Sequence, residues 1–408
     1  MNYGFFRVAS VSPSLSVADC NFNSKQIIEL VKKAQDKKIK LLVFPELSIC
    51  AYTCADLFTQ KTLQEECYIV LKNICEETKN CNILFCVGLP VELDSERFNC
   101  AAFVFKGKVL ALIPKSFIPN YSEFYESRWF ASFSENTVKQ ISLCKGLEDI
   151  PFGTDIFIQD ENDSSIKISA ELCEDLWVPF SPSTRHALNG ATIIANLSAS
   201  NEVAGKAEYR RILVTGHSAK TVSAYIYANA SHDESSTDMI FSGHSIIAAN
   251  GAIKAESGLF ENTQEFLIAD IDLEKLTQDR IKSTTFSRST SFAKSEYKTI
   301  FVSGLQQEHF ADNIDEQLYE KIDLHPFVPS DIQKRKERCF SIIEMQSEGL
   351  AKRLRHIHAQ GAVIGLSGGL DSTLALLVCA RAFDKCNISR EKIFSITMPA
   401  FGTTDRTF

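Results

Sequence analysis

A cysteine lies where an alternating apolar segment gives way to acidic residues. Residues 166–170 place apolar side chains at every second position, which predicts a strand with one buried face. Cys173 follows, and its neighbours Glu171, Glu174 and Asp175 all carry negative charge. Because nearby negative charge raises the pKa of a thiol, these neighbours alone would keep Cys173 unreactive. A nucleophilic Cys173 therefore needs a base and a cation from elsewhere; without them it is a small core residue.

Two further predicted strands end on charged residues that would supply these groups. Glu46 follows the apolar run 41–44, and Lys115 follows the second strand of a predicted hairpin at 109–113. If the three strand ends meet at one edge, Glu46 accepts the thiol proton and Lys115 stabilises both the thiolate and an oxyanion. The backbone N–H of Glu174 would be a second oxyanion donor. Taken singly, Glu46 and Lys115 are also consistent with solvated strand-end charges, and spacing alone leaves both interpretations open.

A glycine-containing loop near residue 370 has the composition of a phosphate site. It lies between an apolar run and a predicted helix, so its backbone N–H groups would face an anion at the helix N-terminus. The segment comprises Leu366, Ser367, Gly368, Gly369, Leu370, Asp371, Ser372 and Thr373. It lacks the ending of a Walker loop and the pattern of a dinucleotide fingerprint, and a plain tight turn is the alternative interpretation. Asp371 is a candidate Mg²⁺ ligand, because carboxylates beside polyphosphate commonly share its cation.

The amino-acid composition argues against two classes of binding partner, nucleic acids and anionic membranes. The formal net charge is -8 and hydrophobic residues make up 45% of the chain, which predicts a globular protein without nucleic-acid or anionic-membrane partners. No apolar run is long enough to span a membrane. The 13 cysteines include no CxxC pair and follow no secretory signal, which indicates a reducing, cytoplasmic compartment.

The order of predicted elements divides the chain into two domains. Strands and helices alternate through residues 1–272, with hairpins, one of them turning at Asn250-Gly251, that a plain parallel sheet would not contain. Residues 273–330 are polar and rich in Ser and Thr, and we interpret them as a connecting segment. It ends in an extended linker at 325–329, where prolines flank apolar residues. A second domain occupies residues 331–408.

Three motifs in the first domain resemble the nitrilase superfamily and, more narrowly, the glutamine-dependent NAD+ synthetase family. They are FPEL at 44–47 with Tyr52, PKSFIPNYSEFYE at 114–126, and LCEDLW at 172–177. The resemblance continues into the second domain and covers essentially the whole chain. It implies an α/β protein: a nitrilase-type α-β-β-α sandwich, followed by the start of a doubly wound, adenine nucleotide hydrolase-like domain with a PP-loop.

The resemblance also implies roles for particular residues. The family's Glu-Lys-Cys triad falls on Glu46, Lys115 and Cys173, and a second acid that would orient Lys115 falls on Glu123. Lys206 occupies a position where the family more often carries arginine. The residues that would bind glutamine are Tyr121, Ser200, Lys206, Tyr52 and Glu174. The loop at 366–373 would be the PP-loop, and residues 399–406 would be the segment that follows the second strand of the synthetase domain.

The activity implied by this resemblance couples two reactions. Glutamine hydrolysis would supply ammonia, which would amidate nicotinate adenine dinucleotide to NAD+ with ATP and Mg²⁺, in a protein that commonly forms homo-oligomers. Because we identify two strands of the ATP domain, we expect this chain to be a C-terminally truncated product that keeps the glutaminase half. The alternatives are a stand-alone amidase or nitrilase, which has no use for a pyrophosphate-binding loop, and a non-catalytic scaffold, which has no need of the triad.

Overall fold

The chain folds into two compact units. The computed structural model describes residues 4–134, 137–236, 238–261, 264–306, 318–320, 322 and 325–398. The first unit spans Met1–Glu320 and the second Lys321–Phe408. Among the described helices, none is both long and apolar enough to cross a bilayer.

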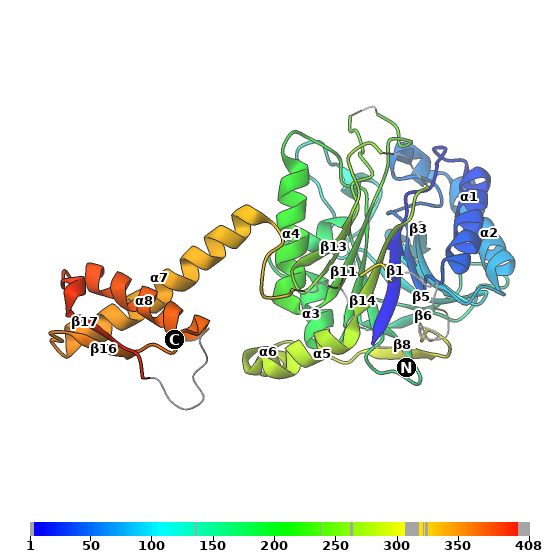
Figure 1. Ribbon diagram of the computed structural model, residues 1–408. Coiled ribbons are helices and arrows are strands. Elements are labelled where there is room, and N and C mark those ends of the chain that lie inside the picture. The colour runs from blue at the N-terminus through cyan, green and yellow to red at the C-terminus, as the bar shows by residue number, and fades with distance from the viewer. Residues whose placement is uncertain are drawn as a thin grey trace. The chain divides into compact units, whose positions relative to one another are not determined.

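Two large β-sheets form the centre of the first unit (Figure 1). The first has eight strands, in the order β14 (Leu267–Asp272), β1 (Phe5–Ser10), β2 (Leu41–Val43), β3 (Leu84–Leu93), β4 (Glu96–Phe105), β5 (Lys108–Pro114), β7 (Ile150–Phe152) and β6 (Lys139–Ile141). The second has seven, in the order β13 (Ala252–Glu256), β12 (Ile246–Ala249), β11 (Ala224–Asn229), β10 (Ile193–Ser198), β9 (Lys167–Leu172), β8 (Ile156–Asp160) and β15 (Lys298–Val302).

Helices cover the outer faces of both sheets. Helices α1 (Cys20–Asp36) and α2 (Lys61–Thr78) pack on the first sheet, and α3 (Pro182–Leu188) and α4 (Lys206–Thr221) pack on the second. A third apolar layer fills the space between the sheets, because alternate residues of each strand point to opposite faces. On β2, Leu41 and Val43 face the other sheet, whereas Leu42 faces the helices. The expected α-β-β-α sandwich is confirmed.

Strand direction brings the predicted catalytic residues to one edge. Strands β2 and β3 are parallel, and β4 is antiparallel to both β3 and β5, so β5 runs in the same direction as β2. Glu46 and Lys115 follow the carboxyl ends of β2 and β5. Cys173 begins a short 3₁₀ helix, η3 (Cys173–Leu176), directly after β9 of the facing sheet. All three residues thus follow strand ends.

Residues 273–306 belong to the first unit rather than to a surface connection alone. They form α5 (Leu273–Lys282), α6 (Thr284–Ser289), η4 (Thr290–Phe292) and β15, which pairs in parallel with β8. Strand β15 completes the edge of the second sheet, and Val302 packs in the layer between the sheets. The polar composition of this segment concealed an edge strand, because such strands need few buried side chains.

The second unit contains two helices and a two-stranded parallel sheet. Helix α7 (Ile332–His356) packs against α8 (Leu370–Lys385), and β16 (Ala362–Gly365) pairs with β17 (Ile393–Ile396). A 3₁₀ turn, η6 (Arg390–Lys392), precedes β17. The expected order of helix, strand, glycine loop, helix and strand is therefore present. The segment 399–406 lies outside the described residues.

Candidate active site

A buried ion pair lies at the edge of the first sheet. Lys115 Nζ lies 2.6 Å from Glu46 Oε1, and both side chains are fully buried. Two hydrogen bonds hold the backbone of Lys115 in place. Its N–H donates to Asn99 O at 2.8 Å, and its C=O accepts from Phe133 N at 3.1 Å. Glu46 is held by the backbone N–H of Ala199, which donates to Oε2 at 2.9 Å. The structure thus joins two residues that the sequence placed at separate strand ends.

The second carboxylate beside Lys115 is Glu126, not the expected Glu123. Lys115 Nζ donates to Glu126 Oε2 at 2.8 Å, whereas Glu123 accepts from Asn201 Nδ2 at 2.6 Å. The irregular loop after Lys115 folds back so that Glu126 N donates to Pro119 O (3.2 Å), which turns Glu126 inward. The assignment of Glu123 as the residue that orients Lys115 is therefore corrected to Glu126.

Asn99 bridges the two carboxylates. Its Nδ2 donates to Glu46 Oε1 at 2.6 Å and to Glu126 Oε1 at 2.9 Å, and the side chain is fully buried. One amide and one ammonium thus separate two buried carboxylates that would otherwise repel each other. The sequence signal for Asn99 is a single polar residue in the otherwise apolar run 98–105 of β4, because a buried amide requires hydrogen-bond partners.

Tyr52, one of the residues predicted to bind glutamine, contacts this group and also lines a pocket with Glu123 and Glu126. Its hydroxyl donates to Glu126 Oε2 at 3.0 Å, and the side chain is buried. The backbone N–H groups of Tyr52 and Thr53 donate to the Glu234 carboxylate at 2.8 and 3.0 Å. Glu234 therefore anchors η1 (Tyr52–Thr59), which carries the tyrosine that supports Glu126.

Cys173 occupies a strained turn. Its φ angle is 40°, in the left-handed region that side chains other than glycine adopt at a cost of about 1–3 kcal/mol. The thiol is buried, which raises its pKa, whereas the backbone of Ala199, whose N–H donates to Glu46, acts to lower it. Sharp turns of this kind hold a nucleophile rigidly after a strand.

Burial and neighbouring charges set the protonation states. Burial and the Glu46 carboxylate raise the pKa of Cys173, and the Lys115 ammonium opposes them only in part. Burial raises the pKa of Glu46 to about 7, although Lys115 lowers it. For Lys115, burial favours the neutral form, but Glu126 and Glu46 outweigh it and keep the pKa well above its usual value. At neutral pH this arrangement combines a neutral thiol, a carboxylate able to accept its proton, and a permanent cation.

Several of the residues predicted to bind glutamine lie together at the outer edge of this site. We call this edge the rim; its polar side chains are those of Tyr121, Glu174, Lys206, Asn201 and Glu123. Tyr121 is half exposed, and its hydroxyl donates to Glu174 Oε2 at 2.9 Å. Lys206 Nζ donates to Asn201 Oδ1 and lies 5.4 Å from the ring centroids of both Phe124 and Trp177. The rim therefore carries a cation and, through Glu174 and Glu123, two carboxylates.

Ser200 is buried beneath the rim. Its backbone N–H donates to Asn229 Oδ1 at 2.8 Å, and its hydroxyl accepts from Arg210 Nη2 at 3.4 Å. Arg210 is itself fully buried and pairs with Glu202 at 3.0 Å. Ser200 thus belongs to the supporting layer of the rim. Nothing in the sequence pattern singled out Arg210, because a charged residue on a helix is usually solvated.

The glycine loop of the second unit has the backbone expected for an anion site. Gly368 adopts a φ of 76°, and Gly369, which precedes α8, provides no side-chain cap, so the first N–H groups of the helix point to the loop. Ser372 Oγ donates to Gly369 O at 3.0 Å and Thr373 Oγ1 donates to it at 2.9 Å. Asp371 lies in the first turn. The described residues contain no group of three or more His, Cys, Asp or Glu suited to a metal ion.

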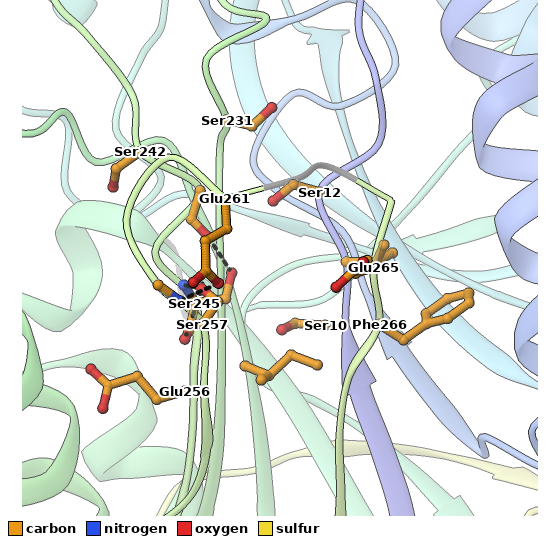
Figure 2. A pocket seen from close by; sticks show the side chains of 14 residues that line it. Ser10, Ser12, Ser231, Ser242, Ser245, Glu256, Ser257, Glu261, Glu265 and Phe266 are labelled. Carbon is orange, nitrogen blue, oxygen red and sulfur yellow. Dashed lines mark hydrogen bonds between the residues drawn. The ribbon is translucent and has the colours of Figure 1, made fainter.

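A separate pocket lies between the ends of β1 and the β12–β13 hairpin, and Figure 2 shows it lined by serine hydroxyls and carboxylates. Its volume is about 160 Å³, and residues predicted from the sequence as catalytic do not line it. It adjoins the supporting layer of the rim, because Ser12 Oγ donates to Asn229 O at 2.6 Å and Ser245 Oγ accepts from Asn229 N at 3.1 Å. The pocket is thus distinct from the Cys173 site.

Comparison with known proteins gave matches to both units. Residues 7–281 match the carbon-nitrogen hydrolase family, and residues 342–407 match the NAD synthase family. The glutamine-dependent NAD(+) synthetase of Mycobacterium leprae is 34% identical over 408 residues, which cover 99% of this chain and 59% of that protein. The chain therefore spans less than two thirds of that relative's length.

Two solved structures share the fold. The glutamine-dependent NAD(+) synthetase from Cytophaga hutchinsonii superposes with a TM-score of 0.58 at 22% identity, covering 99% of this chain and 62% of that one. An amidase from Nesterenkonia sp. superposes with a TM-score of 0.53 at 19% identity, covering 69% of this chain and 96% of that one. The expected resemblance to the synthetases is thus confirmed by sequence, and the fold by structure.

Proposed function

This chain belongs to the carbon-nitrogen hydrolase family, and from that premise we propose that its first unit hydrolyses the side-chain amide of glutamine. The observation that carries the proposal is the buried Glu46–Lys115 pair, whose charges both act on the buried Cys173 thiol. A buried base, cation and nucleophile together serve acyl transfer and have no evident use in a scaffold.

The first half of the reaction forms a thioester. Glu46 takes the Cys173 proton as the sulfur attacks the amide carbon, and the carbonyl electron pair moves to oxygen. Lys115 and the backbone N–H of Glu174 stabilise that oxyanion. As the carbon–nitrogen bond breaks, protonated Glu46 gives its proton to the leaving nitrogen, so ammonia departs and Glu46 is again a carboxylate.

The second half regenerates the enzyme. Glu46 takes a proton from water as the oxygen attacks the thioester carbon, and Lys115 again stabilises the oxyanion. Collapse expels the Cys173 sulfur, which recovers the proton from Glu46, and glutamate leaves. Glu126 takes no proton in this scheme; with Asn99 it holds Lys115 charged and in place.

The charges of the rim are complementary to the α-carboxylate and α-ammonium groups of an amino acid. Lys206 faces the α-carboxylate of glutamine, and the carboxylates of Glu174 and Glu123 face its α-ammonium group. Trp177 and Phe124 flank Lys206 and restrict its movement. These opposite charges favour a zwitterionic amide over a simple aliphatic amide.

The second unit contributes the start of an ATP site within this proposal. The backbone at Ser367, Gly368 and Gly369 would bind pyrophosphate while ATP adenylates the carboxylate of nicotinate adenine dinucleotide; ammonia would displace AMP to give NAD+. Asp371, in the first turn of α8, would hold Mg²⁺ as a single carboxylate, because that ion takes its other ligands from phosphate and water. All 13 cysteines are free thiols, which supports a cytoplasmic setting, and homo-oligomer formation is part of the same proposal.

The decisive experiment measures ammonia and glutamate release from glutamine by the purified chain, beside release from propionamide and asparagine. We expect glutamine to be preferred over propionamide by at least about 10²-fold, because propionamide leaves the rim charges unpaired; asparagine carries the same charges and tests the length of the side chain. Equal rates on propionamide would favour the stand-alone amidase. Adding ATP and nicotinate adenine dinucleotide then tests whether NAD+ forms.

The pH profile reports on Glu46. The base works as a carboxylate, so kcat/KM should rise with pH through the pKa of about 7 and level off above it. The same pKa implies that folding takes up a proton at Glu46 between pH 4.5 and about 7, so its contribution to stability is lost as pH rises through that window. Glu46→Gln should abolish the rising limb; a limb that persists in this variant assigns the base elsewhere.

Substituting Glu126 and Glu123 in separate variants distinguishes their roles. Glu126→Gln should lower kcat by roughly 10²-fold, because Lys115 loses one of two carboxylates that hold it charged. Glu123→Gln should raise KM for glutamine several-fold and leave kcat close to wild type, since Glu123 lies at the rim. Steady-state kinetics decide, and the reverse pattern would restore Glu123 as the residue that orients Lys115.

A further inference from the structure

One buried carboxylate links the turn that carries Cys173 to the strand end that carries Lys115. Asp175 Oδ1 accepts from the backbone N–H groups of Ser116 and Phe117 at 3.1 and 2.8 Å. Its Oδ2 accepts from the N–H of Leu172 at 3.0 Å. The side chain is 1% exposed. Asp175 therefore binds the residues directly after Lys115 and the residue directly before Cys173.

These contacts join parts of the site that belong to different sheets. Lys115 follows β5 of the first sheet, and Leu172 ends β9 of the second. Strand pairing fixes each residue within its own sheet but does not determine the position of one sheet's edge against the other. Backbone-to-carboxylate bonds across the layer do so, because each one satisfies a backbone N–H that is shielded from water and is costly to leave without a partner.

The same carboxylate supports the strained turn. Its bond to Leu172 N–H closes the turn in which Cys173 adopts a φ of 40°. That turn also directs the backbone N–H of Glu174, the second oxyanion donor of the proposed mechanism. Burial and the nearby Glu171 raise the pKa of Asp175, whereas the N–H groups of Leu172 and Phe117 favour its ionised form.

We propose that Asp175 is a positioning residue that sets the location of Lys115 relative to Cys173 by binding both turns at once. It touches neither substrate nor the reacting atoms, and it acts through the backbone of Ser116, Phe117 and Leu172. The inference rests on the proposed function, because it concerns the nucleophile and cation of that reaction. Sub-ångström shifts between such groups change rates strongly.

The test compares Asp175→Asn with a matched control, Asp160→Asn. Asp160 is also fully buried and also accepts three backbone N–H bonds, from Asn162 (2.9 Å), Asp163 (3.2 Å) and Leu305 (2.9 Å), away from Cys173. Both variants replace one carboxylate oxygen acceptor by an amide group and should unfold at lower temperature. A purely structural role predicts that both variants behave alike in every other respect.

Two readouts follow the position of Lys115. In Asp175→Asn, kcat for glutamine hydrolysis should fall by roughly 10-fold or more while KM changes less than about threefold. In Asp175→Glu, which keeps the negative charge near the thiol but displaces the carboxylate, the pH profile of Cys173 alkylation by iodoacetamide should shift to higher pH, because a displaced Lys115 stabilises the thiolate less. The other charges acting on this thiol, those of Glu46, Glu126 and Lys206, are unchanged by the variant. Asp160→Asn should keep the wild-type profile and kcat.

The proposal is overturned if Asp175→Asn and Asp160→Asn give the same kcat, or if Asp175→Glu keeps the wild-type alkylation profile. If Asp175→Asn does not fold, Asp175→Glu, which keeps the charge but displaces the carboxylate by one methylene, decides by the same comparison. The alkylation profile needs no substrate. A wild type that hydrolyses no glutamine would therefore refute the proposed function while the Asp175 comparison still stands or fails by itself.

Discussion

Cys173→Ala should lose glutamine hydrolysis by at least about 10⁴-fold, because the variant has no atom to form the thioester and the remaining groups cannot generate a nucleophile. Intact mass measured after mixing wild type with glutamine should show the added glutamyl group, and the variant should show none. The fold should persist, since alanine fits the space of the buried thiol and its Cβ meets the same steric constraint in the turn as that of cysteine.

Cys86→Ala is the matched control for this prediction. Cys86 is also fully buried, on β3 in the layer between the sheets, and contacts no group of the catalytic site in the proposed mechanism. It should lose some stability, as any core truncation does, and keep hydrolysis near the wild-type rate. Residual activity in Cys173→Ala above one hundredth of wild type would place the nucleophile elsewhere.

Lys115→Met should reduce both activity and stability. The variant keeps an unbranched side chain one atom shorter but removes the cation, so the oxyanion loses its charged partner and kcat should fall roughly 10³-fold. The carboxylates of Glu46 and Glu126 then remain buried without the ammonium that lies 2.6 and 2.8 Å from them. Breaking a fully buried pair in this way costs about 3 kcal/mol.

Denaturant unfolding and steady-state kinetics measure these two effects separately. Lys32→Met is the control, because Lys32 pairs with Glu77 at 2.9 Å on the surface, where both side chains are about half exposed. An exposed pair contributes less than about 1 kcal/mol, so this variant should match wild type in both measurements. A Lys115→Met variant as stable as Lys32→Met would show that the buried carboxylates do not depend on Lys115.

The sequence by itself determined the class of fold and the three residues at its centre. Alternating apolar segments with polar ends predicted buried strands, and Glu46, Lys115 and Cys173 each follow such a segment. This inference is local: the periodicity of a strand and the position of its end depend on neighbouring residues only. The glycine loop before α8 was predictable for the same reason, since a strand, two glycines and a helix are adjacent in the chain.

The tertiary structure alone decided which side chains complete the site. The loop after Lys115 has no helical or strand periodicity, so nothing local distinguishes Glu123 from Glu126; the bond from Glu126 N to Pro119 O and the amide of Asn99 do so. Likewise, nothing in the sequence distinguishes Asp175 from Glu171 and Glu174, the other two acids beside Cys173. The contacts of Asp175 to Ser116 and Phe117 span 59 and 58 residues, and such long-range pairing is set by the packing of two sheets, not by residue order.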